Sequence, residues 1–109
     1  MREDGWLRKN IIYKTTFPNG KIYIGIDWGK DGHHIDYFGS WDVEYVFGDF
    51  TEDDFRDWTL RKEILFESDD ARDVQEKEAG FILKYESNNP SIGYNKRPKF
   101  RDGKKQLFP

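Results

Sequence analysis

Two stretches near the start of the chain are dense in large apolar and β-branched residues. Residues 10–16 and 21–27 hold mainly isoleucine, tyrosine and threonine, which are typical of β-strands. The residues between them read Phe-Pro-Asn-Gly, a sequence typical of a tight turn. The pattern therefore predicts an antiparallel β-hairpin.

The chemistry of this turn decides how the two strand tyrosines face each other. A two-residue Asn-Gly turn would put Tyr13 and Tyr23 on opposite faces of the hairpin. Pro18 instead suits the second position of a type I turn that ends in a left-handed Gly20. That three-residue loop pairs Tyr13 with Gly25, so both hydroxyls project from one face as diagonal neighbours. The two phenols then form either the floor of a reactive site or an aromatic pair that packs the sheet.

The chain after the hairpin predicts helices and one more strand. A Gly-rich loop over residues 28–40 leads to a short helix over residues 41–50, which is expected to bury Val43, Val46 and Phe47.

Thr51 is a good N-cap for a further helical turn. Residues 57–67 alternate in polarity, which predicts a third strand. Ser68 then caps the longest helix, which is expected to run to about Tyr85 or Glu86. These elements predict a small α+β sandwich.

A carboxylate interrupts the apolar stripe of this long helix. The residues at helical spacing on the inward side are Ala71, Val74, Glu78, Phe81, Ile82 and Tyr85. A lone carboxylate is costly to bury unless it is paired or binds a metal ion. Glu78 is therefore expected to hold a metal ion, to pair with Arg61 or Lys84, or to sit at the rim of the stripe.

Composition limits the class of protein. The chain has 109 residues, enough for one domain, and 17% of them are aromatic, so a few large rings must carry the core. It contains no cysteine, which excludes disulfides and thiolate metal sites. No stretch has the length of a membrane span, and no apolar signal region follows Met1. We expect a soluble, unexported protein, compatible with the cytoplasm.

The net charge of −3 hides a strong asymmetry along the chain. Residues 31–73 hold fourteen acids against four Lys/Arg, whereas residues 96–105 hold six Lys/Arg against one acid. Residues 1–30 also hold six Lys/Arg against three acids, so a polyanion would be attracted to the two ends of the chain and repelled by the middle. The plainer interpretation is a solvated acidic face and a frayed basic tail.

An ordered set of motifs adds a family resemblance. The set comprises Ile11-Ile12-Tyr13, Tyr23-Ile24-Gly25, Glu78 in Glu-x-x-Phe-Ile, and Gly93-Tyr94-Asn95, with Tyr37-Phe38-Gly39-Ser40 between them. In this order it resembles the GIY-YIG nuclease family, most closely the small phage-encoded homing-type members. The resemblance covers residues 10–95 and leaves residues 1–9 as an N-terminal extension and residues 96–109 as a basic tail. It implies a three-stranded antiparallel sheet flanked by helices.

The resemblance also implies a magnesium-dependent DNA endonuclease. Tyr13 and Tyr23 match the motif tyrosines, one of which takes a proton from the attacking water or positions it. Glu78 matches the glutamate that binds one Mg²⁺ (or Mn²⁺) ion, and Asn95 matches the asparagine that closes the site. A tyrosine has an ordinary pKa of about 10, so a base role needs nearby positive charge to lower it.

The chain departs from the family pattern in two places. Ile11 replaces the glycine of the first motif, and the arginine that family members carry on their first helix is missing. The position of that arginine corresponds to His33 or His34. The alternative interpretation is that both histidines are ordinary loop residues. The residues that offer a substitute phosphate clamp are His33, His34, Lys14, Arg61 and Lys62.

Cations at the two ends of the nuclease region are expected to bind DNA. They are Lys14, Lys21, Lys96, Arg97, Lys99 and Arg101. Homing relatives usually gain specificity from a further DNA-binding region, so we expect self-association, a separate DNA-binding protein, or a longer chain. Two alternatives remain: a binding module that kept the fold and lost catalysis, and an inhibitor whose acidic middle imitates a DNA backbone.

Overall fold

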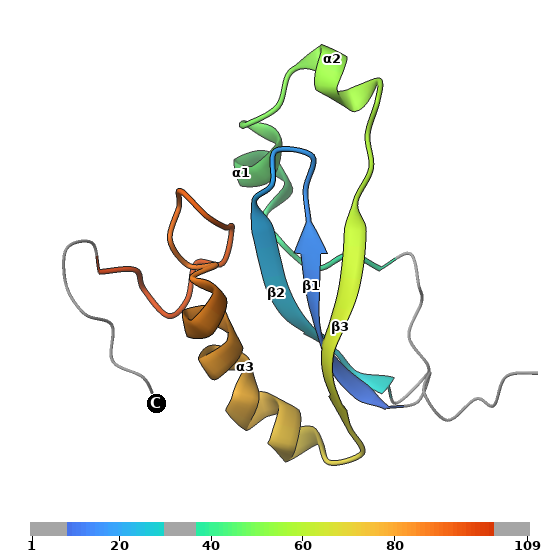
Figure 1. Ribbon diagram of the computed structural model, residues 1–109, viewed down its shortest axis with the longest axis vertical. Coiled ribbons are helices and arrows are strands. Elements are labelled where there is room, and N and C mark those ends of the chain that lie inside the picture. The colour runs from blue at the N-terminus through green and yellow to red at the C-terminus, as the bar shows by residue number, and fades with distance from the viewer. Residues whose placement is uncertain (1–8, 30–36, 102–109) are drawn as a thin grey trace, which may run out of the picture.

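The computed structural model describes residues 9–29 and 37–101, and it confirms the α+β class (Figure 1). The elements are β1 (Asn10–Thr16), β2 (Ile22–Asp27), α1 (Val43–Phe47), α2 (Glu52–Phe55), β3 (Arg61–Ser68) and α3 (Ala71–Tyr85). The strands form one antiparallel sheet in the order β2-β1-β3, so β2 is an edge strand. No helix in the described ranges is long and apolar enough to cross a membrane.

The turn between β1 and β2 has the predicted three-residue geometry. The Phe17 amide donates to the Lys21 carbonyl over 2.9 Å, and Gly20 has a φ of +88°. Tyr13 consequently pairs with Gly25, as the prediction required. The preference of proline and glycine for their turn positions therefore sets the register of the whole hairpin.

The two faces of the sheet have different roles. Ile12 and Ile24 are fully buried on one face, where they pack against Val74 and Ile82 of α3. Tyr13 lies on the opposite face because its side chain alternates with that of Ile12. Helix α3 thus covers the aliphatic face of the sheet and leaves the phenol face to other segments.

Strand β3 begins later than the sequence predicted. The prediction started at residue 57, but the ladder with β1 starts at Arg61. Trp58 and Leu60 instead pack against a second core cluster formed by Phe17, Val46 and Tyr94. A change of register beside the Ile12/Tyr13 step then leaves one residue of β3 unpaired as a bulge, which breaks the simple alternation of that strand.

Helix α1 buries fewer side chains than predicted. Val46 is fully buried, whereas Val43 is 52% exposed and Phe47 is 38% exposed. The helix is only five residues long, so a single side chain reaches the second cluster. Helix α2 follows with the predicted Thr51 N-cap, whose hydroxyl accepts from the Asp54 amide in a capping box.

The segment after α3 attaches to the free edge of β2. Helix α3 ends at a left-handed Glu86, in line with the prediction, and the chain then turns back. The amide of Tyr94 donates to the Ile22 carbonyl over 2.9 Å, next to a parallel bridge between Ile22 and Gly93. A Cβ at Gly93 would lie 2.4 Å from the Ser87 carbonyl oxygen, so only glycine fits this approach.

Candidate active site

The two motif phenols lie side by side over the backbone of β2. A Cβ at Gly25 would lie 2.5 Å from the Tyr13 hydroxyl oxygen and 3.1 Å from the Tyr23 ring. The missing side chain of this glycine is therefore what makes room for both rings. Tyr13 is only 1% exposed, whereas Tyr23 is half-buried.

The segment that carries the Tyr-Phe-Gly-Ser string covers the Tyr13 hydroxyl. The Thr15 hydroxyl donates to the Phe38 carbonyl and fixes this segment on the sheet. Gly39 has a φ of +130°, and a Cβ there would lie 3.0 Å from the Tyr13 hydroxyl oxygen. The Tyr37 ring packs edge-on against Tyr13 at 5.9 Å. Tyr13 is thereby enclosed from three sides.

A buried ion pair completes the phenol face. The Lys62 ammonium lies 3.7 Å from the Asp27 carboxylate, and their side chains are only 11% and 13% exposed. The same ammonium lies 5.1 Å from the centre of the Tyr13 ring. Lys62 was one of the substitutes considered for the family arginine, but it faces an aromatic ring instead of lining the cavity described below.

Both phenols remain protonated at neutral pH. Burial raises the pKa of Tyr13 far above its ordinary value, and the neighbouring Tyr37 and Tyr23 raise it further. Burial also raises the pKa of Tyr23, and although a hydrogen bond with Ser40 lowers it, Tyr37 and Glu78 add to the rise. The positive charge that a tyrosine base would need does not lower either pKa.

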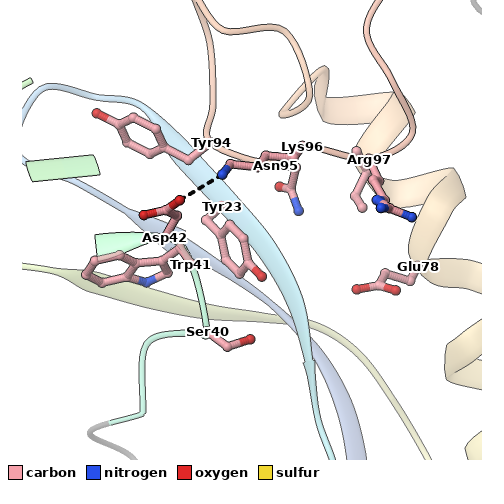
Figure 2. Close-up of a pocket in the computed structure, with 10 residues that line it drawn as sticks. Tyr23, Ser40, Trp41, Asp42, Glu78, Tyr94, Asn95, Lys96 and Arg97 are labelled. Carbon is pink, nitrogen blue, oxygen red and sulfur yellow. Dashed lines mark hydrogen bonds and ion pairs between the residues drawn. The ribbon is translucent and has the colours of Figure 1, made fainter. Parts of the chain in front are cut away.

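A cavity of about 420 Å³ opens beside Tyr23, between β2, α3 and the segments on either side of them. Its lining residues are Tyr23, Ser40, Trp41, Asp42, Glu78, Ile82, Tyr94, Asn95, Lys96 and Arg97. Figure 2 shows the Tyr23 hydroxyl pointing toward α3, from which Glu78 projects its carboxylate into the same space. The predicted meeting of a motif tyrosine with Glu78 is therefore found for Tyr23, while Tyr13 stays behind it.

Glu78 has no ion pair or hydrogen bond within residues 9–29 and 37–101. The predicted ion pairs of Glu78 with Arg61 or Lys84 are not found. The Arg61 guanidinium lies 3.9 Å from the Glu63 carboxylate, and the Lys84 ammonium lies over the Tyr85 ring. The Glu78 side chain is half-buried, and burial raises its pKa. A desolvated carboxylate that faces a cavity is suited to bind a cation.

Asn95 fastens the C-terminal segment to β2. Its side-chain oxygen accepts from the Ile24 amide and its side-chain nitrogen donates to the Ile24 carbonyl, each over 2.8 Å. These bonds use both ends of the amide, so Asn95 holds its neighbours in place beside β2. The next two residues, Lys96 and Arg97, reach the cavity as a result.

The cavity has a cationic side formed by these two residues. Lys96 pairs with Asp42 over 2.8 Å, the contact drawn as a dashed line in Figure 2. Arg97 is exposed and forms no ion pair with any residue that the structure describes. Both were predicted as DNA-binding residues of the tail, and the structure adds that both line the cavity that Glu78 also lines, with Arg97 on the Glu78 side (Figure 2).

Two other expected cations lie away from the cavity. Lys14 is on the α3 face of the sheet, 3.2 Å from Glu63, and therefore on the opposite face from the phenols. Arg61 is an exposed residue at the start of β3 and does not line the cavity.

Three more of the expected cations do not line the cavity. Lys21 pairs with Asp49 over 3.0 Å. Lys99 and Arg101 are exposed. His33 and His34 lie outside the described residues.

Sequence reasoning missed Ser40, Trp41 and Asp42 as lining residues. The Tyr-Phe-Gly-Ser string could have indicated these residues. Its glycine, Gly39, lets this segment cross close over the two phenols, and the lining residues follow directly after it. Within the described ranges, no group of three or more His, Asp or Glu residues is arranged to hold a metal ion. Any ion here would rely on Glu78 for its protein ligand.

A scan of protein-family models found no match to the chain, and searches of curated proteins and of solved structures found none either.

Proposed function

We propose that this protein is a magnesium-dependent DNA endonuclease of the GIY-YIG type. The observation that carries the proposal is the convergence of the Tyr23 hydroxyl and the unpaired Glu78 carboxylate on one cavity, with Arg97 beside them (Figure 2). An acid, a phenol and a cation around one space are suited to a phosphodiester, whose charge must be held while water attacks.

The residues present fit one divalent cation. Mg²⁺ commonly takes one or two carboxylates and completes its shell with waters and phosphate oxygens. Glu78 supplies such a carboxylate, already partly stripped of water and without a competing cation in the described chain. A bound Mg²⁺ would supply Lewis-acid polarisation of the phosphate and neutralise the charge on the leaving oxygen.

Tyr23 acts through its proton in this proposal. Its raised pKa makes it a poor base but keeps its O–H available as a hydrogen-bond donor. From the floor of the cavity this donor orients a phosphate oxygen or the attacking water. Tyr13 is enclosed by glycines and Tyr37, so its part is to hold the Tyr23 ring and the covering segment in position.

Arg97 takes the place of the family's missing helix arginine. It enters the cavity from the C-terminal segment, and its planar guanidinium suits bidentate binding of a phosphate. Lys96 stands next to it but shares its charge with Asp42. Lys99 and Arg101 continue the basic run away from the cavity, where they would bind DNA phosphates without reading sequence. Cleavage by this chain is consequently expected to be weak and salt-sensitive.

The test is nicking of supercoiled plasmid with and without Mg²⁺. Glu78→Gln should lower metal-dependent nicking by at least about a hundredfold, because it removes the only proposed protein ligand of the ion. Glu76→Gln is the matched control, since Glu76 is exposed on the same helix and should leave nicking unchanged. Equal nicking by wild type and Glu78→Gln would refute the assignment.

The second candidate is a DNA-binding module without catalysis. This function is favoured because no nearby positive charge lowers the pKa of Tyr13 or Tyr23, so neither is activated as a base. In that case the protein binds DNA with a salt dependence that Arg97→Ala reduces, yet wild type shows no Mg²⁺-dependent nicking. A gel-shift titration run beside the plasmid assay separates the two functions.

A further inference from the structure

We infer that helices α1 and α2 form a docking surface for the basic C-terminal segment of a second copy of this chain. The inference concerns side chains that do not line the cavity, and it does not depend on the proposed nuclease activity. The surface, called the α1–α2 surface here, is defined by Val43, Phe47 and Phe55. These side chains are 52%, 38% and 39% exposed, an unusual concentration of bare apolar area for one short stretch.

The rings of this surface form one continuous group. Phe47 packs edge-on against Phe55 at 4.9 Å and against Trp58 at 5.8 Å, and Phe50 lies 4.8 Å from Trp58. The outermost rings therefore rest on others that are more deeply set. Such an array offers fixed aromatic faces to a cation at little cost in ordering.

Carboxylates are dense in the stretch of sequence that carries the rings. Residues 42–57 contain seven acids and a single base, Arg56. Arg56 is occupied by Glu52 and Asp53 of its own helix. Glu44 and Asp57 are exposed and have no ion pair in the described chain. The surface is thus anionic at its edge and aromatic at its centre, which repels DNA and attracts lysine and arginine.

The protein already binds two of its own lysines in this manner, at carboxylates that precede and follow α1. Lys96 pairs with Asp42 at 2.8 Å while its ammonium lies 5.2 Å from the centre of the Tyr45 ring. Lys21 pairs with Asp49 at 3.0 Å and lies 5.3 Å from the centre of the Tyr94 ring.

Each lysine uses one ring and one carboxylate together. Phe47 and Phe55 offer the same two kinds of group, because Glu44 precedes Phe47 by three residues and Asp57 follows Phe55 by two. Among the described residues, no lysine or arginine lies over the Phe47 ring or the Phe55 ring.

The complementary charge is present in the same sequence. Residues 96–105 hold six Lys/Arg and one acid, and Lys99 and Arg101 are exposed without an ion pair in the described chain. In Figure 1 this red segment runs beside α3, away from α2 at the far end of the sheet. The carbonyl of Pro98 accepts from the Asn88 amide over 2.7 Å, which helps to hold it there. Lys99 and Arg101 are therefore available to another molecule, in a head-to-tail contact between unlike surfaces.

Sedimentation velocity over a concentration series tests the inference. At about 0.05 M salt wild type should associate with rising concentration, and at about 1 M salt, where the Debye length is about 3 Å, it should be monomeric. Glu44→Lys with Asp57→Lys, and separately Lys99→Glu with Arg101→Glu, should each weaken association at least tenfold. All four residues are exposed, so a thermal melt should show both double variants folded. Phe47→Ser should weaken association while leaving its salt dependence in place.

Mixing the two double variants is the decisive step. Their reversed charges complement each other, so the mixture should associate although each variant alone does not. Glu76→Lys with Arg72→Glu is the control, because it alters exposed charges on α3 and should behave as wild type. A wild type that stays monomeric at low salt, variants that associate unchanged, or a mixture that stays monomeric would each overturn the inference.

Discussion

Replacing Glu78 by glutamine should make the folded protein more stable and remove its response to Mg²⁺. The carboxylate is half-buried and has no partner in the described chain, so its ionised form is poorly solvated at neutral pH. An unpaired polar group in a fully buried position costs about 1–3 kcal/mol. For a half-buried group we expect about 1 kcal/mol of added stability in the variant, which raises Tm by about 4 °C for a domain of this size.

The pH dependence has a definite sign. Burial raises the pKa of Glu78 above its ordinary value of 4.5, so the folded state binds this proton more tightly than the unfolded state. Stability from this group is present at low pH and is lost as the pH rises from about 4.5 through the raised pKa. The Tm difference between the variant and wild type should therefore be small near pH 4 and grow toward neutrality.

Magnesium should reverse the order of the two proteins. With a dissociation constant on the order of 1 mM, 10 mM Mg²⁺ would stabilise wild type by about 1.4 kcal/mol. The glutamine variant lacks the charge and should not respond. Differential scanning fluorimetry over pH 4–8, with and without Mg²⁺, measures both effects, and Glu76→Gln provides the control. A variant less stable than wild type at neutral pH, or equal Mg²⁺ shifts in both, would refute the reasoning.

Two further substitutions test the framework of the site. Gly25→Ala places a Cβ 2.5 Å from the Tyr13 hydroxyl oxygen and should cost about 1–3 kcal/mol in urea unfolding, whereas Gly48→Ala meets ordinary contacts of 3.4 Å and should be near neutral. Asn95→Ala removes both hydrogen bonds to the Ile24 backbone and should cost about 2 kcal/mol, with faster exchange of the Ile24 amide; unchanged exchange would contradict this role.

Local chemistry made the hairpin predictable from the sequence. Pro18 and Gly20 each have a strong preference for one turn position, and their order leaves a single register. The shared face of Tyr13 and Tyr23 follows directly from that register. The position of Glu78 on α3 was predictable in the same way, because helical periodicity shows which residues share a face.

The errors arose where distant contacts compete with local pattern. Residues 57–60 alternate in polarity like a strand, but Trp58 and Leu60 pack against the cluster of Phe17, Val46 and Tyr94 instead of extending the ladder. Helix α1 was expected to bury three side chains, yet its length allows one. The placement of Arg97 in the cavity depends on Asn95, which bonds to β2 from far along the chain. No local pattern contains that information.

The free edge of β2 unites these observations. An unpaired edge normally needs protection, and here the Gly93–Asn95 segment supplies it by bonding to Ile22 and Ile24. The same bonds bring Arg97 to a cavity whose other walls are Tyr23 from β2 and Glu78 from α3. The same hydrogen bonds therefore both protect the edge of the sheet and bring the cavity-lining residues together. A cation carried by this segment reaches the cavity without a helix after β2, and Arg97 is the residue that we propose to bind the phosphate there.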